Sequence, residues 1–216
     1  MSRVRVKVCG ITSFKDLNMV VEAGADAVGF VVDVPQSSKS LSLDEAEKLI
    51  RATPVFVETV AVTVFACLKS LKEICEKLNP DLVQVHGLRF NEKIRETFPN
   101  TRLIGAVQAK SEGAVVAALD LSKTFDAVLV DSHVHGSYGG TGKTHDWNLS
   151  RRIRDVIHPK PLILAGGLTP ENVKEAIRVV KPHAVDVSSG VESRPGAKDR
   201  YKVLQFIERA KEVDVC

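Results

Sequence analysis

The chain has 216 residues, of which 44% are hydrophobic and 26% are charged, and its net charge is +3 at pH 7. This balance is typical of a globular protein with one core, in a single domain spanning residues 1–216. The interspersed charges leave no basic stripe for nucleic acid, and no apolar run is long enough for a membrane span or a secretory signal. We therefore expect a cytoplasmic protein that binds neither nucleic acid nor membrane and acts on small molecules.

Strand-like and helical apolar patterns alternate along the whole chain. The predicted strands are residues 4–8, 27–32, 56–64, 82–85, 102–107, 127–130, 162–164 and 184–187. The predicted helices are residues 14–23, 44–51, 68–78, 91–98, 112–119, 149–157, 170–180 and 201–213. Because parallel strands need crossover connections that cover the sheet, this alternation predicts a parallel α/β sheet. Eight β/α units in so short a chain favour a single closed (β/α)₈ TIM barrel, with an open doubly wound sheet as the alternative.

Two helix starts are well marked. Residues 42–45 read Ser-Leu-Asp-Glu, which predicts a capping box between Ser42 and Glu45. Thr169 followed by Pro170 predicts a hydroxyl N-cap with proline at the first helical position. Both signals support the helical segments that follow them.

Polar residues inside the predicted strands can be assigned to a face, because successive side chains alternate. Six polar side chains fall on the inward face, namely Lys7, Cys9, Gln84, His86, Asp131 and Asp186. Unpaired burial is costly for charged groups, so these residues must pair or serve chemistry. Cys9, His86 and Asp131 stand at the carboxyl ends of strands, where barrel enzymes collect catalytic groups. Lys7 and Asp186 lie deeper and predict a supporting ion pair.

The four cysteines form no Cys-x-x-Cys pair and adjoin no histidine-rich cluster, so neither a zinc site nor a disulfide framework is predicted. Taken singly, Cys9 has the alternative of a small core residue. His86 could equally be a satisfied core histidine, and Asp131 could cap the loop that follows it. Their joint placement at one rim of the barrel favours an active site.

Two further strand ends are rich in small residues. Residues 165–167 read Ala-Gly-Gly, and residues 188–190 read Ser-Ser-Gly. Small residues let backbone N–H groups approach an anion, and the loops after strands seven and eight are the usual phosphate site of such barrels. We therefore predict phosphate binding by Gly166, Gly167, Ser188, Ser189 and Gly190. The alternative is that these glycines only make tight turns.

A long glycine-dense loop, residues 136–147, follows Asp131. Its Gly-Thr-Gly-Lys-Thr segment is similar to a P-loop, but Ser137 stands where the motif requires its first glycine. The broken spacing argues against a nucleotide site. We expect the loop to close over a bound sugar and exclude water, with an ordinary surface loop as the alternative.

Five segments taken together closely resemble the phosphoribosylanthranilate isomerase family of tryptophan biosynthesis. They are Lys7–Thr12, Val83–Gly87, Val130–Ser132 with Tyr138–Trp147, Leu164–Asn172 and Val185–Glu192. The likeness runs in order from the first predicted strand to the eighth. It implies a (β/α)₈ barrel that performs an Amadori rearrangement of N-(5-phosphoribosyl)anthranilate, without metal or cofactor. It implies a phosphosugar substrate. The sequence leaves the oligomeric state open between a monomer and a homodimer.

The resemblance also implies residue roles. Cys9 corresponds to the family's general base and Asp131 to its general acid, while His86 and Asp186 would line the substrate pocket. Lys39 stands where the family carries an arginine that binds the anthranilate carboxylate. Lysine keeps the charge but loses the bidentate fork, so we expect a weaker contact. This departure leaves open a related aminoaldose–ketose isomerase with a broader substrate range, and a catalytically silent phosphate-binding barrel remains the non-enzyme alternative.

Overall fold

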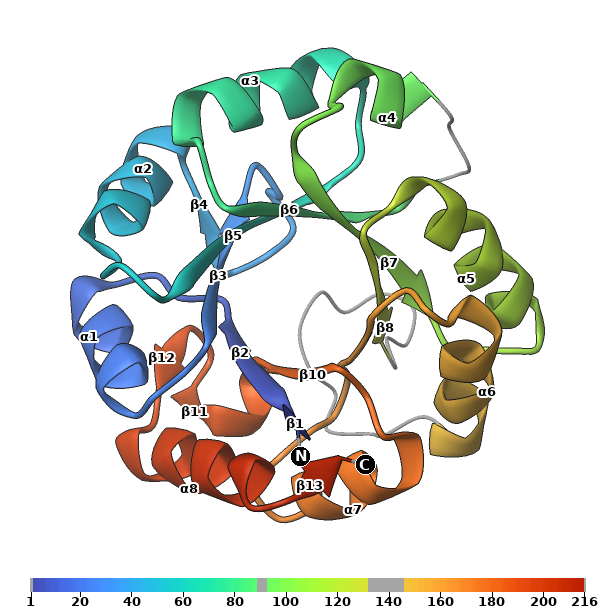
Figure 1. Cartoon of the computed structure of the whole chain (residues 1–216). Coiled ribbons are helices and arrows are strands. Elements are labelled where there is room, and N and C mark those ends of the chain that lie inside the picture. Colours follow the sequence, from blue (N-terminus) through green and yellow to red (C-terminus); the bar gives the residue numbers. More distant parts are fainter. Residues whose placement is uncertain (1, 89–92, 132–145, 216) are drawn as a thin grey trace.

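Eight parallel strands close into a barrel in the computed structural model, which describes residues 2–88, 93–131 and 146–215 (Figure 1). The barrel strands are β2 (Arg5–Cys9), β3 (Ala27–Val32), β5 (Glu58–Val64), β6 (Leu82–His86), β7 (Arg102–Gln108), β8 (Ala127–Asp131), β9 (Leu162–Leu164) and β10 (Ala184–Val187). The pairing of β2 with both β10 and β3 closes the ring, and all of these pairings are parallel. The predicted barrel is therefore confirmed, and the open sheet is wrong.

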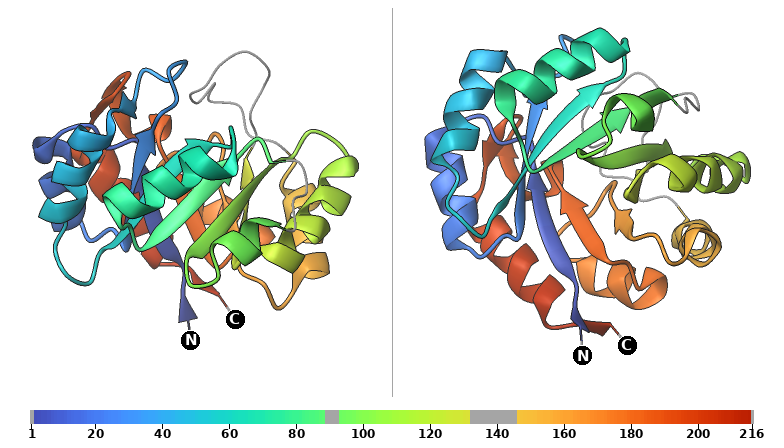
Figure 2. Two further views of the ribbon diagram at one scale, coloured as in Figure 1. Left: turned by 90° about the horizontal axis from the view of Figure 1, so that it is seen from above. Right: turned by 45° about the horizontal axis from the view of Figure 1, so that its top comes forward.

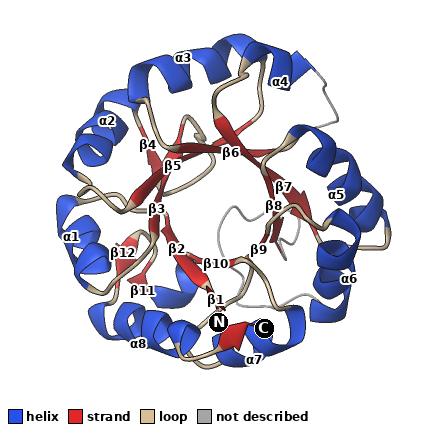
Figure 3. Ribbon diagram, viewed as in Figure 1, coloured by secondary structure: helices blue, strands red, loops and turns tan. Residues whose placement is uncertain are grey.

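Helices cover the outside of the barrel (Figure 3). They are α1 (Phe14–Glu22), α2 (Leu43–Ala52), α3 (Leu68–Leu78), α4 (Lys93–Thr97), α5 (Gly113–Thr124), α6 (Trp147–Ile157), α7 (Val173–Val180) and α8 (Arg200–Lys211). Each buries an apolar side, because a surface helix places residues three and four apart on one face. Within the described residues, no helix is both long and apolar enough to cross a bilayer.

The apolar core has two layers, as expected when strand side chains alternate between faces. Val6, Val83 and Val185 belong to the cluster between strands and helices. Val60, Ile104 and several neighbours form a separate cluster inside the barrel, and Cys9 belongs to it. The predicted inward direction of the polar side chains of β2, β6 and β10 is consistent with the outward direction of these valines.

Several short strands complete the fold and were not predicted. β1 (Ser2–Arg3) pairs antiparallel with β13 (Asp214–Val215), which brings the two termini together (Figure 2). β4 (Ser40–Leu41) pairs with the carboxyl end of β3. After β10, a 3₁₀ turn leads into a hairpin of β11 (Glu192–Arg194) and β12 (Ala197–Lys198).

The helix boundaries differ from the prediction by three residues or more at two places, and by at most two residues elsewhere. α7 begins at Val173 rather than at residue 170, because Thr169 Oγ1 accepts the N–H of Glu171 and Asn172 Oδ1 accepts the N–H of Thr169 at 2.8 Å. The segment before Val173 is therefore a side-chain-bonded turn. α5 continues to Thr124, since Leu121 adds another buried position to its inner face. The capping box of Ser42 and Glu45 is confirmed.

The strand predicted from residue 56 begins at Glu58 instead. Phe56 has a positive φ of 79° and its side chain is 99% exposed, so it lies in a turn outside the sheet. The P-loop-like segment and most of the predicted lid, residues 136–145, lie outside the described residues, as do residues 91 and 92 at the predicted start of α4.

Candidate active site

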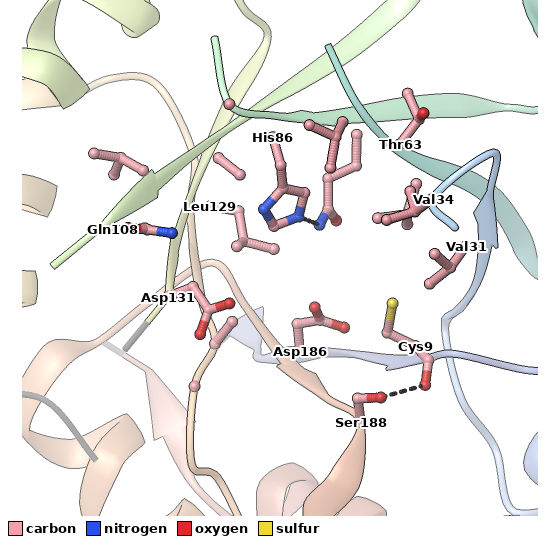
Figure 4. A pocket seen from close by; sticks show the side chains of 18 of the residues that line it. Cys9, Val31, Val34, Thr63, His86, Gln108, Leu129, Asp131, Asp186 and Ser188 are labelled. Atoms are coloured by element: carbon pink, nitrogen blue, oxygen red, sulfur yellow. Dashed lines mark hydrogen bonds between the residues drawn. The ribbon is translucent and has the colours of Figure 1, made fainter. Parts of the chain in front are cut away.

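A cavity of about 640 Å³ lies at the carboxyl ends of the barrel strands (Figure 4). All ten residues predicted for the site line it, namely Cys9, Lys39, His86, Asp131, Gly166, Gly167, Asp186, Ser188, Ser189 and Gly190. They come from six parts of the chain that are far apart in sequence. The volume lies in the range typical of small-molecule sites.

Cys9 ends β2 and is 8% exposed. Its thiol packs over Gly29 of β3, where a Cβ atom would lie 2.8 Å from Sγ and 3.1 Å from Cε of Lys7. Burial raises the pKa of the Cys9 thiol, while the ammonium of Lys7 is the largest opposing influence and Asp186 adds to the increase. The free protein therefore holds Cys9 mainly as a thiol at neutral pH.

A chain of polar contacts crosses the barrel below Cys9. Lys7 Nζ lies 3.1 Å from Asp186 Oδ1, on the neighbouring strand, and donates to Gln84 Oε1 at 2.9 Å. Burial disfavours the Lys7 ammonium, but Asp186 and then Cys9 outweigh this and raise the pKa of Lys7. The predicted ion pair is confirmed. Asp186 Oδ1 is buried beside Lys7 Nζ and, among the described residues, accepts no aligned hydrogen bond.

His86 is fixed from one side by the same contacts. Gln84 Nε2 lies 2.8 Å from His86 Nε2. An amide NH₂ only donates, so a neutral His86 accepts at Nε2 and carries its proton on Nδ1. His86 reaches into the cavity from the end of β6 (Figure 4).

Asp131 lies across the cavity from Cys9, with Asp186 between them (Figure 4). It ends β8 opposite Gln108 of β7, and its backbone carbonyl accepts the N–H of Ala109 at 2.9 Å. The side chain is partly exposed to the cavity. A titratable acid on one wall and a thiol on the other can exchange protons with opposite ends of one ligand.

Lys39 reaches the cavity because β4 holds the preceding turn against the end of β3. Gly10, with φ of 76°, leaves room for its stem, since a Cβ there would lie 2.7 Å from Lys39 Cδ. The ammonium is not simply open to a ligand as the sequence predicted. It lies 2.8 Å from Glu192 Oε1 and donates to Ser188 Oγ at 2.9 Å.

Sequence reasoning missed Glu192 and Lys198, both of which are buried beside this cavity. They lie in the hairpin after β10, where no strand alternation relates a residue to a face. The signal that could have found them is that two charged residues, Glu192 and Lys198, follow the predicted phosphate loop at residues 188–190.

The two predicted phosphate loops touch each other. Gly166 and Gly167 have positive φ values of 85° and 64°. A Cβ on Gly190 would lie 1.8 Å from the carbonyl oxygen of Leu168, so only glycine permits this contact. Because α7 starts at Val173, the loop is not the first turn of a helix, and the predicted N-cap at Thr169 with Pro170 as the first helical residue is wrong.

Gly190→Ala is expected to raise KM for a phosphorylated substrate by about tenfold or more, since amide bonds to an anion contribute about 1.5–3 kcal/mol each. The added methyl would push the two loops apart. Gly113→Ala is the matched control, because its Cβ would meet only the Ser111 hydroxyl at an ordinary 3.5 Å. Steady-state kinetics measures the effect, and an unchanged KM in a folded Gly190→Ala variant would contradict it.

A closed parallel barrel with acid–base candidates and glycine-rich loops around one cavity defines a (β/α)₈-barrel enzyme. The family model for N-(5'-phosphoribosyl)anthranilate (PRA) isomerase matches residues 6–209. The chain is 46% identical over 209 residues to N-(5'-phosphoribosyl)anthranilate isomerase of Methanothrix thermoacetophila, covering 96% of this chain and 98% of that protein. It is 43% identical to the Pseudomonas fluorescens enzyme, covering 98% and 100%.

Solved structures agree with this match. Phosphoribosyl anthranilate isomerase of Thermotoga maritima superposes with a TM-score of 0.87 at 41% identity, covering 97% of this chain and 100% of that one. A phosphoribosyl anthranilate isomerase in complex with reduced 1-(o-carboxyphenylamino)-1-deoxyribulose 5-phosphate gives 0.81 at 38% identity, with the same coverage. The chain belongs to the N-(5'-phosphoribosyl)anthranilate isomerase family, and is thus an aldose–ketose isomerase.

Proposed function

We propose that this protein converts N-(5-phosphoribosyl)anthranilate to 1-(2-carboxyphenylamino)-1-deoxyribulose 5-phosphate in tryptophan biosynthesis, with Cys9 as general base and Asp131 as general acid. The observation that carries the acid–base mechanism is the placement of Cys9 and Asp131 on opposite walls of one cavity (Figure 4). The family resemblance supports which of the two is the base and which the acid. The family and the analogue bound in a related structure support the choice of substrate.

The acid step opens the sugar ring. Protonated Asp131 gives its proton to the furanose ring oxygen as the C1–O bond breaks, and the anilino nitrogen lone pair forms the C=N bond of a protonated Schiff base. Asp131 is left as a carboxylate. Its place at a strand end, partly exposed to the cavity, suits a group that must change its protonation state at the substrate.

The base step moves a proton from carbon. Cys9, as thiolate, takes the proton from C2, and the electron pair of that C–H bond forms the C1=C2 bond of an enolamine. Tautomerisation then gives the ketose. Because burial raises the pKa of Cys9, only a small thiolate fraction is present at neutral pH, and it grows as the pH rises. Lys7 is the neighbour that most favours the thiolate.

The remaining groups hold the substrate. Gly166, Gly167 and the loop from Ser188 to Gly190 would bind the phosphate through backbone amides. Asp186, which lines the cavity, would accept a sugar hydroxyl. Lys39 would face the anthranilate carboxylate with the one ammonium hydrogen not used by Glu192 and Ser188.

A fluorescence assay that follows the disappearance of phosphoribosylanthranilate tests this function directly. Because Lys39 replaces the family arginine, the related histidine-pathway aminoaldose should be assayed beside it. Turnover of that second substrate alone would replace the proposed function with the broader isomerase. Binding of the reduced product analogue without turnover would support the silent phosphate-binding barrel.

We further propose that the protein can form a homodimer through the exposed turn at Val55 and Phe56. These side chains are 81% and 99% exposed, and a contiguous apolar tip of this kind favours burial against a partner. A T. maritima relative is described as dimeric. Sedimentation should give a dimer that Phe56→Ser shifts toward monomer, whereas replacement of Tyr201, an aromatic side chain that is 68% exposed, by Ser should not. A monomer at all concentrations would contradict this.

A further inference from the structure

We propose that Lys198 and Glu192 determine the anion affinity of the cavity: Lys198 neutralises Glu192, so that Lys39 keeps an unneutralised positive charge toward the substrate carboxylate. The inference deepens the proposed function and rests on it for the identity of the ligand. The three side chains, Lys39, Glu192 and Lys198, are called the Lys–Glu–Lys cluster below.

Lys198 has no capacity left for a ligand. Its side chain is 0% exposed, and Nζ donates to the carbonyl of Cys9 at 2.7 Å, to Glu192 Oε1 at 2.9 Å and to the carbonyl of Ser188 at 3.2 Å. An ammonium has three hydrogens, and with Ser188 Oγ at 3.5 Å four acceptors surround it. Lys198 therefore acts through its charge and through the groups that it holds.

Glu192 is shared between the two lysines. Oε1 lies 2.8 Å from Lys39 Nζ and 2.9 Å from Lys198 Nζ. Burial disfavours the carboxylate, but Lys198 and Lys39 outweigh burial and hold the pKa of Glu192 below its usual value. A single negative charge thus lies between two ammonium groups.

With all three side chains ionised, the charges of the Lys–Glu–Lys cluster sum to +1. Burial lowers the pKa of Lys198, and Glu192 is the neighbour that most favours its ionised form. The nearby Asp16 carboxylate accepts the backbone N–H of Lys198 at 3.4 Å rather than its ammonium, and Lys7 is paired with Asp186. Without Lys198, Glu192 and Lys39 would form a neutral pair. A buried net charge is costly, and an anion that enters the cavity relieves that cost, so the surplus charge favours carboxylate binding at Lys39.

A structural role for Lys198 is the competing explanation, because it also fixes the carbonyl of Cys9. The net charge of the cluster in three variants distinguishes the electrostatic role of Lys198 from the structural one. Lys198→Met lowers the cluster to 0, Glu192→Gln raises it to +2, and the double variant returns it to +1 while the bond to Cys9 remains lost. Only an electrostatic role predicts that the second substitution rescues the first.

The experiment measures the dissociation constant of anthranilate by NMR titration at millimolar ligand concentrations. 2-Aminobenzamide, which has a similar shape but no carboxylate charge, is the control ligand. The native protein should prefer anthranilate. Lys198→Met should weaken anthranilate binding about tenfold, because the charge-assisted contact to Lys39 is weakened, and the double variant should regain most of the affinity. Affinity for 2-aminobenzamide should stay constant throughout.

A native protein without preference for anthranilate, or a double variant as weak as Lys198→Met, would overturn the proposal. If Lys198→Met does not fold, Glu192→Gln tests the proposal instead. This variant raises the charge of the cluster to +2, so weaker anthranilate binding than in the native protein would contradict the proposal. Lys198→Arg, which keeps the charge, should bind like the native protein. If the variants rank in anthranilate affinity as expected but the protein does not turn over phosphoribosylanthranilate, only the proposed function is rejected. If the protein turns over this substrate but all variants bind anthranilate equally, only this inference is rejected.

Discussion

Cys9→Ser and Asp131→Asn are each expected to lower kcat by at least about 10²-fold, the lower range for loss of an acid–base group. Serine fits the space of the thiol, but its hydroxyl does not ionise near neutral pH. Asparagine keeps the shape of Asp131 and has no acidic proton for the ring oxygen. KM should change much less, because neither substitution alters the phosphate loops or Lys39.

The fluorescence assay for phosphoribosylanthranilate provides the measurement, with circular dichroism and thermal melting to verify the fold. Cys75→Ser is the matched control for the thiol, since Cys75 lies on α3 outside the cavity and burial raises its pKa to about 11. It should retain native turnover. Near-normal kcat in a folded Cys9→Ser or Asp131→Asn variant would refute the role assigned to that residue.

Lys7→Met is expected to destabilise the protein by about 3–5 kcal/mol, because it leaves Asp186 charged and buried without its partner. The double variant Lys7→Met, Asp186→Leu removes both charges and should recover most of that loss. Urea unfolding monitored by circular dichroism gives the free energies. A double variant no more stable than the single one would show that the pair contributes packing or hydrogen bonds rather than charge balance.

The pH dependence of this pair has a definite sign. Since the pKa of Lys7 is raised in the folded protein, the stabilisation from its ionised form is fully present below the ordinary lysine range. It is lost only as the pH rises through the raised value. The difference in stability between native protein and double variant should therefore be constant from neutral pH to about pH 9.

Lys7→Met should also shift alkylation of Cys9 to higher pH, because Lys7 is the largest influence favouring the thiolate. The measurement requires a background in which Cys67, Cys75 and Cys216 are serine. Cys67 is exposed and its pKa is lowered by hydrogen bonding to Ser70, so it would otherwise react first. An unchanged alkylation profile would remove Lys7 from the activation of Cys9.

The sequence by itself determined the parts of the site that lie on strands. Lys7 and Cys9 could be placed inside the barrel beside Asp186 because side-chain direction in a strand has a fixed period of two. Asp131 could be placed at the rim because strand and loop differ in composition. The family resemblance added the roles of Cys9 and Asp131, which geometry alone does not assign.

Only the tertiary structure decided how the charges outside the strands are arranged. Lys39, Glu192 and Lys198 meet because barrel closure brings the turn before β4 and the hairpin after β10 to the same rim. Loops have no side-chain period, and the start of α7 depended on bonds between Thr169 and its neighbours. The contact between Lys39 and Ser188, which are 149 positions apart, follows from the register of the strands around the closed barrel. A local sequence pattern does not contain that register.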